Sequence, residues 1–448
     1  MKSNVKLTKS LRLSDIVFIG LAWMTPMVYF TVFGISFETS GGMITQAYLL
    51  AFVAIFFTAC NYGIMSRTFP TSGSAYTYVA KSMHPNLGFV VGWAVLLDYF
   101  FSPLIASLSF GIYLNAQFPS VPVYIWITLL NVAITVINIM GIKISANISK
   151  IFVWIQILFI LLFSAFLIRN LNGGMNVFQP FQTDAPFSAV LAGSALICFC
   201  FLGFDAITTM SEEAIDAKRT IPKAVIVMIS IALIVYFIPS YLTQLVFPNV
   251  TFSNADTAGF EIVKMAGGAF LSAVFITVLI LATFTQGLTS LTSVSRLLYV
   301  MGRDSVLPKR FFGYLHPKYK TPVINIAIGA IFSMLAIVIS LESAVKFVSF
   351  GALTAFTFVN LSVIFQKFIK EKKRSPRQTV LYLIFPLIGA AFIGWLLTLL
   401  DLDALMMGGI WLVFGIGYYL IRKKRIGAGE EHSAIAEENS PIPNPVEL

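Results

Sequence analysis

The sequence predicts an all-α integral membrane protein with twelve transmembrane helices. Hydrophobic residues make up 58% of the 448-residue chain, and charged residues make up only 11%. Soluble domains carry about 25% charged residues. The 30 basic and 20 acidic side chains are therefore too few to cover a soluble protein of this length, and long uncharged blocks separate them. These observations exclude a soluble enzyme and a disordered chain.

The uncharged blocks locate the expected helices, because about 20 apolar residues cross a bilayer as a helix. The blocks cover residues 16–37, 39–66, 99–142, 151–168, 185–204, 224–255, 265–295, 321–341, 347–366, 378–400 and 404–421. The block 99–142 is too long for one helix and contains a proline-rich turn at 118–122, so we divide it into two spans. The first of these begins near Gly88. Period-2 alternation is absent, which disfavours strands.

The basic residues predict the orientation of the chain in the membrane. With the N-terminus in the cytoplasm, the inner segments carry 27 of the 30 basic residues, and the outer loops keep only Arg169, Lys264 and Lys346. This distribution follows the positive-inside rule and predicts a multi-pass plasma-membrane protein with both termini in the cytoplasm. The net charge of +10 is therefore an orientation signal. The basic stretches lack interleaved aromatic residues, so no nucleic-acid partner is expected.

Three regions are expected along the chain. Residues 1–15 form a cytoplasmic N-tail, and residues 16–425 form the transmembrane domain. Residues 426–448 are polar and acidic with three prolines, a composition that predicts a disordered cytoplasmic C-tail.

Helix breakers occur at membrane depth in the first and sixth spans. Pro26 removes a backbone hydrogen bond in the middle of span one, and Gly203 lies within span six. Broken helices at this depth are tolerated where they line a water-filled site. The matched breaks predict two inverted five-helix repeats, about 16–169 and 185–370, with a binding site between them and two extra helices within 378–421.

Two acidic residues, Asp98 and Asp205, fall inside the expected spans. A charge at the bilayer centre costs about 2.5–3.5 kcal/mol, so each carboxylate needs a cavity or a partner. Arg296, at the inner end of span eight, is the nearest basic residue in depth. A cationic substrate or a proton would supply the missing charge. The alternative is a protonated carboxyl that is hydrogen-bonded within the bundle, which we favour less for Asp205 than for Asp98.

Other polar groups inside the spans are candidates for ion coupling. Span eight carries four hydroxyl side chains that could ligate Na⁺, although packing within the bundle is the favoured role for most of them: Thr289, Ser290, Thr292 and Ser293. Gln156 is the only strongly polar side chain of span five. The three cysteines and three histidines have no disulfide or metal-ligand spacing, and no nucleophile–base pair appears. We therefore expect no enzyme activity, no cofactor and no metal site.

Three motifs resemble those of the amino acid–polyamine–organocation transporters, and the resemblance covers nearly all of residues 10–425. The motifs are residues 69–78 with Gly88-Phe89 and Gly92-Trp93, residues 201–205 with 212–224, and residues 295–308. Within this family, residues 20–27, 96–99 and 295–304 are most similar to bacterial putrescine importers.

The resemblance implies a twelve-helix fold with a five-plus-five inverted repeat (LeuT-like), in a bacterial plasma membrane. It also implies ion-coupled uptake by alternating access. The substrate contacts that it implies lie at the break in span one, at a third-span aromatic residue and at the break in span six: Met24, Thr25, Pro26, Tyr99, Phe199, Phe201, Gly203 and Asp205.

Two departures from the family pattern bear on the substrate and on the coupling ion. Many amino acid carriers of the family hold the substrate carboxylate on amides of a glycine-rich break in span one, whereas Pro26 supplies no N–H here. Some proton-coupled members carry a lysine in span five, where Gln156 stands in this sequence. Gln does not titrate, so Asp205 becomes the first candidate for a proton switch. We favour H⁺ over Na⁺ as the coupling ion.

We therefore expect a secondary active importer of putrescine or a related polyamine. The ammonium groups would lie at Asp98 or Asp205. The alkyl chain would lie among four aromatic side chains: Trp23, Tyr99, Phe199 and Phe201. An amino acid permease of the same family, with a zwitterionic substrate, is the first alternative. A nutrient sensor that binds without transport is the second.

Charged residues on the cytoplasmic side could form a gate of ion pairs. The candidates are Arg219, Arg296, Arg303 and Asp304. A solvated charged face, which includes Glu212 and Glu213, is an equal alternative for this region, because exposed ion pairs contribute little.

Overall fold

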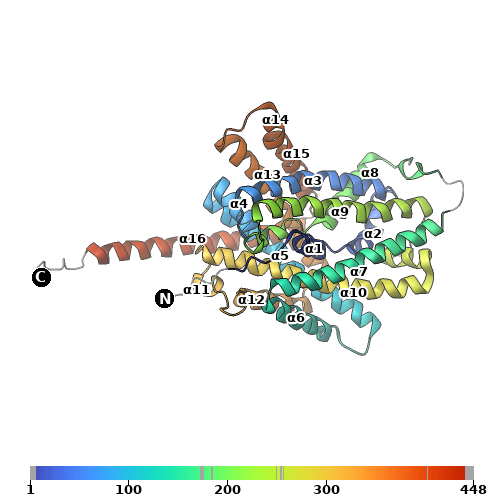
Figure 1. Ribbon diagram of the computed structural model, residues 1–448, viewed down its shortest axis with the longest axis horizontal. Helices are drawn as coiled ribbons and strands as arrows, with labels where there is room; N and C mark the ends of the chain where they lie inside the picture. The colour runs from blue at the N-terminus through green and yellow to red at the C-terminus, as the bar shows by residue number, and fades with distance from the viewer. Residues whose placement is uncertain are drawn as a thin grey trace, which may run out of the picture.

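The computed structural model describes residues 7–171, 176–182, 185–248, 250–252, 255, 257–400 and 402–438, and this part of the chain is a bundle of helices (Figure 1). The α-helices are α1 (Leu13–Met24), α2 (Val28–Thr39), α3 (Ile44–Thr68), α4 (Ser74–Ser82), α5 (Pro85–Gln117), α6 (Val123–Met140), α7 (Ile142–Arg169), α8 (Phe187–Ile197), α9 (Ala217–Val246), α10 (Ala258–Arg303), α11 (Lys309–Phe312), α12 (Val323–Ser333), α13 (Leu341–Val363), α14 (Pro376–Thr379), α15 (Phe385–Thr398) and α16 (Leu402–Glu438). Short 3₁₀ segments are η1 (Gln179–Phe181), η2 (Cys198–Phe201), η3 (Ala206–Glu213) and η4 (Met334–Ile337), and π-helical turns are η5 (Ile364–Lys370) and η6 (Val380–Ile384).

The helices have the lengths and the apolar composition of membrane spans. Within the described residues, ten helices are long and apolar enough to cross a membrane. The pair α1 and α2 forms an eleventh span that is bent by 46° at the break between them. The shorter apolar helix Val323–Ile337 falls on the remaining expected span, 321–341. The prediction of an all-helical membrane protein with a broken first span is confirmed.

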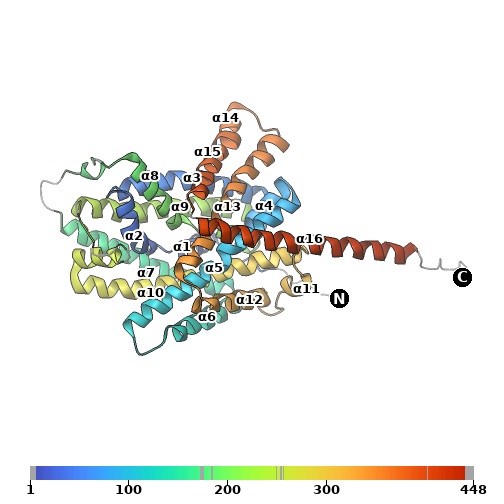
Figure 2. The ribbon, with the colours of Figure 1, turned by 180° about the vertical axis from the view of Figure 1, so that it is seen from behind.

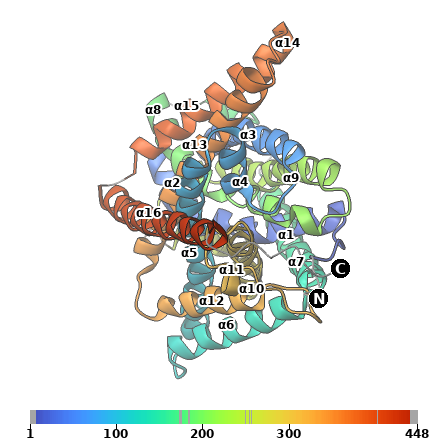
Figure 3. The same ribbon diagram turned by 90° about the vertical axis from the view of Figure 1, so that its left-hand side faces the viewer.

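Helix α5 passes through the middle of the bundle, where it packs against α10 and α13 (Figure 3). The described chain begins at one end of the bundle, and α16 leaves the bundle at the same end (Figures 1 and 2). We call this end the terminal end and the opposite end the far end. A buried residue of α5 is therefore surrounded by protein on several sides.

Several expected span boundaries differ from the observed ones, and three of them show the cause. We expected spans five and seven to begin after the nearest charges, at residues 151 and 224, but α7 begins at Ile142 and α9 begins at Ala217. Charged side chains do not end a helix where they reach solvent or a partner. The expected end of span seven at 255 is also wrong, because α9 ends at Val246, shortly before Pro248, and proline disrupts a helix.

The last helix is longer than the span expected over 404–421. Helix α16 continues to Glu438, so the structure has helix over residues 426–438, where we expected the start of a disordered tail. This stretch is rich in Ala and Glu, which favour helices. The remainder of the expected tail, residues 439–448, lies outside the described residues.

Candidate functional site

The first span is interrupted between Met24 and Val28. Thr25 has a positive φ of 54°, which is costly for a residue with a side chain. Its hydroxyl donates a hydrogen bond to the Ala22 carbonyl at 3.0 Å. The next residue, Pro26, has no N–H to donate. The break therefore offers few amide donors in the middle of the bundle, and the carbonyls of Ala22, Trp23 and Thr25 accept hydrogen bonds from within it.

The sixth span is interrupted beside the first. Helix α8 ends at Ile197, η2 follows, and the backbone leaves helical geometry before η3 begins at Ala206. Gly203 has φ +115°, and a Cβ at this position would lie 2.4 Å from Cδ1 of Trp23 and 3.2 Å from the nitrogen of Met24. Only glycine fits here, so the two breaks are in direct contact. The broken sixth span is thereby confirmed.

A buried carboxylate lies at this junction. Asp205 directly precedes η3 and is 2% exposed. The Tyr99 hydroxyl donates a hydrogen bond to Oδ2 of Asp205 at 2.8 Å. The other carboxylate oxygen of Asp205, Oδ1, is buried and has no hydrogen-bond partner within the described part of the chain. The rings of Tyr99 and Trp23 meet edge to face, with centroids 5.3 Å apart.

The second carboxylate, Asp98, belongs to the same junction because it precedes Tyr99 on α5. Asp98 is 2% exposed and accepts a hydrogen bond from Ser102 at 3.1 Å. Helix α13 packs closely on its backbone, since a Cβ at Gly351 would lie 2.8 Å from the Asp98 nitrogen. Among the described residues, no ion pair joins Asp98 or Asp205 to a basic side chain. The site thus concentrates acidic groups without a resident cation. We call Trp23, Asp98, Tyr99 and Asp205 the carboxylate cluster.

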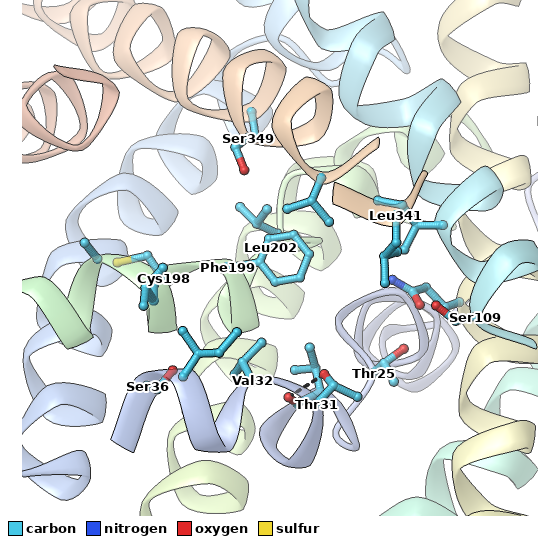
Figure 4. Close-up of a pocket in the computed structure, with 18 of the residues that line it drawn as sticks. Thr25, Thr31, Val32, Ser36, Ser109, Cys198, Phe199, Leu202, Leu341 and Ser349 are labelled. Carbon is cyan, nitrogen blue, oxygen red and sulfur yellow. Dashed lines mark hydrogen bonds between the residues drawn. The ribbon is translucent and has the colours of Figure 1, made fainter. Parts of the chain in front are cut away.

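A cavity of about 480 Å³ reaches the breaks from the far end (Figure 4). Thr25 lines it at the first break, Phe199 and Leu202 line it at the sixth, and the ring of Phe199 projects into the space. On α5, Ile105 and Ser109 line the wall at helical spacings from Asp98, so they share its face of the helix. The carboxylate cluster therefore lies beyond the cavity along the same side of α5.

The predicted substrate contacts divide into three groups. Thr25 and Phe199 line the cavity. Trp23, Met24, Pro26, Asp98, Tyr99, Gly203 and Asp205 are buried beside the breaks, outside the cavity lining. Phe201 instead packs against Phe52 of α3 and Tyr236 of α9, with ring centroids 6.3 and 5.3 Å apart. The structure therefore does not bring Phe201 to the cavity, because consecutive residues of η2 point in different directions.

The coupling candidates on α10 hydrogen-bond mainly to their own helix. Four hydroxyl groups donate to carbonyls three or four residues earlier: Thr289, Ser290, Thr292 and Ser293. Thr292 also bonds to Asn138 of α6 at 2.5 Å. Gln156 of α7 donates to Thr285 of α10 at 3.3 Å, and its amide oxygen is buried without a partner in the described residues. The bonds of Thr292 and Gln156 join α10 to α6 and α7, and a role of these residues in ion coupling stays a prediction.

Two ion pairs close the terminal end below the breaks. Arg296 makes a bidentate pair with Glu213, at 3.0 and 3.1 Å, and both side chains are fully buried or nearly so. Arg303 makes a bidentate pair with Glu212, at 2.7 and 3.0 Å, and its partners also include Asp304 at 3.6 Å. These two pairs join η3 to α10 at the terminal end, and their role as a gate stays a prediction.

Arg219 lies apart from this closed end. Its side chain is 89% exposed and is 3.8 Å from the exposed carboxylate of Asp216. The solvated-face interpretation therefore fits Arg219 and Asp216, whereas Arg296 and Glu213 form a buried pair and Arg303 and Glu212 form a partly exposed one.

The segment before α1 also seals the terminal end, which the sequence did not reveal. Leu11 forms an isolated β-bridge with Ala214, and the amides of Ser10 and Leu11 both donate to the Glu213 carbonyl. Asp15 is buried and contacts Lys143 at 2.5 Å and Lys150 at 3.1 Å. The proximity of Asp15 to the predicted start of span one was a signal for a paired charge, but nothing in the sequence identified its partners.

Comparison with known proteins gives consistent similarities over almost the whole chain. Residues 14–425 match the family model of the amino acid permeases. The low-affinity putrescine importer PlaP of Escherichia coli (strain K12) is 39% identical over 427 residues, which cover 93% of this chain and 94% of that protein. The branched-chain amino acid permease BcaP of Bacillus subtilis (strain 168) is 25% identical over 442 residues, covering 94% of each chain. The methylthioribose transporter of the same strain is 25% identical over 442 residues, covering 93% and 94%. These relatives differ in the substrates that their names give.

Proposed function

The chain belongs to the amino acid permease family and is a multi-pass membrane transporter, and we propose that it imports putrescine or a related polyamine. The observation that carries the proposal is the pair of buried carboxylates, Asp98 and Asp205, which have no basic partner in the described structure. A buried charge needs compensation, and an ammonium group of the substrate supplies it. The 39% identity to the putrescine importer PlaP supports the same substrate class.

The surroundings of the carboxylates suit an alkylammonium ion. Trp23 and Tyr99 offer ring faces and edges beside Asp205, where a cation gains from the ring quadrupole. Carbonyl groups at the break after Met24 accept further hydrogen bonds. The methylene chain between the two ammonium groups then lies against the rings of Trp23 and Tyr99. Pro26 offers no amide for a substrate carboxylate, which favours a substrate that lacks one.

We propose that transport proceeds by alternating access with the terminal end in the cytoplasm. The cavity reaches the breaks from the far end, while ion pairs and the segment before α1 close the terminal end. This arrangement supports an outward-facing conformation. The carboxylate cluster contains the candidate proton-binding groups, and Gln156 does not titrate, so we propose H⁺ rather than Na⁺ as the coupling ion.

Uptake of labelled putrescine into proteoliposomes tests this function. We expect accumulation when a pH gradient, acidic outside, is imposed, and little response to a Na⁺ gradient. We expect unlabelled putrescine to compete and a panel of neutral and acidic amino acids not to compete. Absence of putrescine uptake under both gradients would disprove the proposal.

An amino acid permease is the second candidate, supported by the 25% identity to BcaP. In that case the substrate amine meets carbonyls at the breaks, and the two carboxylates serve structure or coupling. Uptake of a labelled amino acid that unlabelled amino acids inhibit and unlabelled putrescine does not inhibit would establish this alternative. Saturable binding without accumulation would instead establish a sensor.

Replacing Tyr99 by Phe is expected to lower putrescine uptake about tenfold. The substitution keeps the ring beside Trp23 but removes the hydrogen bond to Asp205, and bonds to charged groups contribute about 1.5–3 kcal/mol. The measurement is the initial uptake rate at equal amounts of reconstituted protein. Tyr241→Phe is the matched control, because the Tyr241 hydroxyl bonds to the Val177 carbonyl at the surface. Equal losses in both variants would contradict a specific role for Tyr99.

A further inference from the structure

The cavity wall carries no charged side chain. All the residues that line it in the described structure are apolar or neutral and polar. Its polar groups include Gln286 of α10, and Ser109 of α5 and Ser349 of α13, which are labelled in Figure 4. Asp98 and Asp205 lie beyond the breaks and outside the lining. The described cavity wall itself therefore offers no negative charge to a substrate.

We infer that the uncharged wall selects amines with no more than two ammonium groups and discriminates against longer polyamines. This inference rests on the proposed function. Two carboxylates can pair with two ammonium groups at the carboxylate cluster. A third ammonium group, on a longer chain, would have to remain in the cavity, among groups such as Leu202, Phe199 and Ile105.

The cavity offers the third ammonium group only neutral acceptors. Hydroxyl and amide oxygens form weaker bonds to a cation than a carboxylate does, because a charge-assisted bond is roughly twice as strong. While the cavity is open to water, the third group stays hydrated. When the far end closes during transport, the apolar walls displace that water, and the charge is left without an ionic partner. The free-energy cost of the third ammonium group therefore slows the transport step and weakens binding in the closed cavity.

Gln286 is the position at which this selectivity can be changed. It lines the cavity on α10 and is only partly buried, and Gln286→Glu adds a negative charge with almost no change in volume. Gln182→Glu is the matched control: it is the same substitution on an exposed residue at the loop between α7 and α8, outside the cavity. It also preserves the acceptor oxygen that bonds to Asn176.

The test compares the initial uptake rates of labelled putrescine and of labelled spermidine, a triamine, in proteoliposomes. For the wild-type protein we expect spermidine uptake to be at least about tenfold slower than putrescine uptake, which corresponds to one lost charge-assisted bond. Gln286→Glu is expected to reduce this difference several-fold, and Gln182→Glu to leave it unchanged. Ser109→Asp, on α5, which packs against α10, provides a second variant if Gln286→Glu does not fold.

The outcomes separate this inference from the proposed function. Equal uptake rates of putrescine and spermidine by the wild-type protein would overturn the selectivity and leave putrescine import intact. An equal effect of Gln182→Glu would also overturn it, because the effect would then be general attraction of cations. Absence of putrescine uptake would overturn the proposed function and, with it, this inference.

Discussion

Replacing Asp205 by Asn is expected to lower putrescine uptake about a hundredfold or more. Asn has nearly the same shape and still accepts a hydrogen bond from Tyr99, but it carries no negative charge. The substrate ammonium would then enter a buried site without its ionic partner, a loss of several kcal/mol. Initial uptake rates in proteoliposomes measure the effect. The melting temperature in detergent should not fall, because the substitution removes a buried charge rather than creating one.

Asp216→Asn is the matched control for this substitution. Asp216 is exposed at the terminal end and its contact with Arg219 is long, so its charge contributes little. We expect uptake close to the wild-type rate. If Asp205→Asn also transports at the wild-type rate, Asp205 does not bind the substrate and the site assignment is wrong.

Replacing Glu213 by Gln is expected to be the most destabilising of the conservative substitutions at the terminal end. Arg296 is fully buried, and Gln would leave its guanidinium one neutral acceptor oxygen in place of two carboxylate oxygens. Breaking one partner of a buried pair costs about 3–5 kcal/mol, because the remaining charge stays buried and unpaired. The free energy of unfolding in detergent, or the melting temperature, measures the loss.

Two companion variants separate the buried charge from other effects. Glu212→Gln removes the same group from the neighbouring pair, where Arg303 is 37% exposed, so we expect a loss of only about 0–1 kcal/mol. The double replacement Glu213→Met with Arg296→Met removes both buried charges and should recover much of the stability. Equal melting temperatures of Glu213→Gln and Glu212→Gln would show that the buried pair is not the main support of this end.

The two breaks could be predicted from sequence because their signals are local. Pro26 has no N–H for the helical hydrogen bond, so it interrupts a helix whatever surrounds it. Gly203 lies close to Asp205, a charge that is costly inside a membrane helix. The contact between the breaks followed from the expectation of a repeat, and the structure confirms it through the close approach of Gly203 to Trp23. Asp98 and Asp205 were identified because charges are rare in the spans.

Other features depended on side-chain direction, which sequence spacing does not give. Phe199 and Phe201 are equivalent in type and position, yet one lines the cavity and the other packs on Tyr236. Glu213 and Asp216 belong to one charged stretch, yet only Glu213 turns inward to meet Arg296. The partners of Asp15 lie on α7, more than 120 residues away, so only the folded arrangement identifies them.

The edge-to-face contact of Trp23 with Tyr99 places a fluorophore at the carboxylate cluster. The other tryptophans lie elsewhere in the chain, and Trp93 and Trp411 stack on each other at the contact between α5 and α16. A molecule that enters between Trp23 and Asp205 changes the polarity around one indole and leaves the other five as an internal reference. Intrinsic emission can therefore report occupancy in unlabelled protein, and comparison of that signal with accumulation distinguishes a carrier from a receptor.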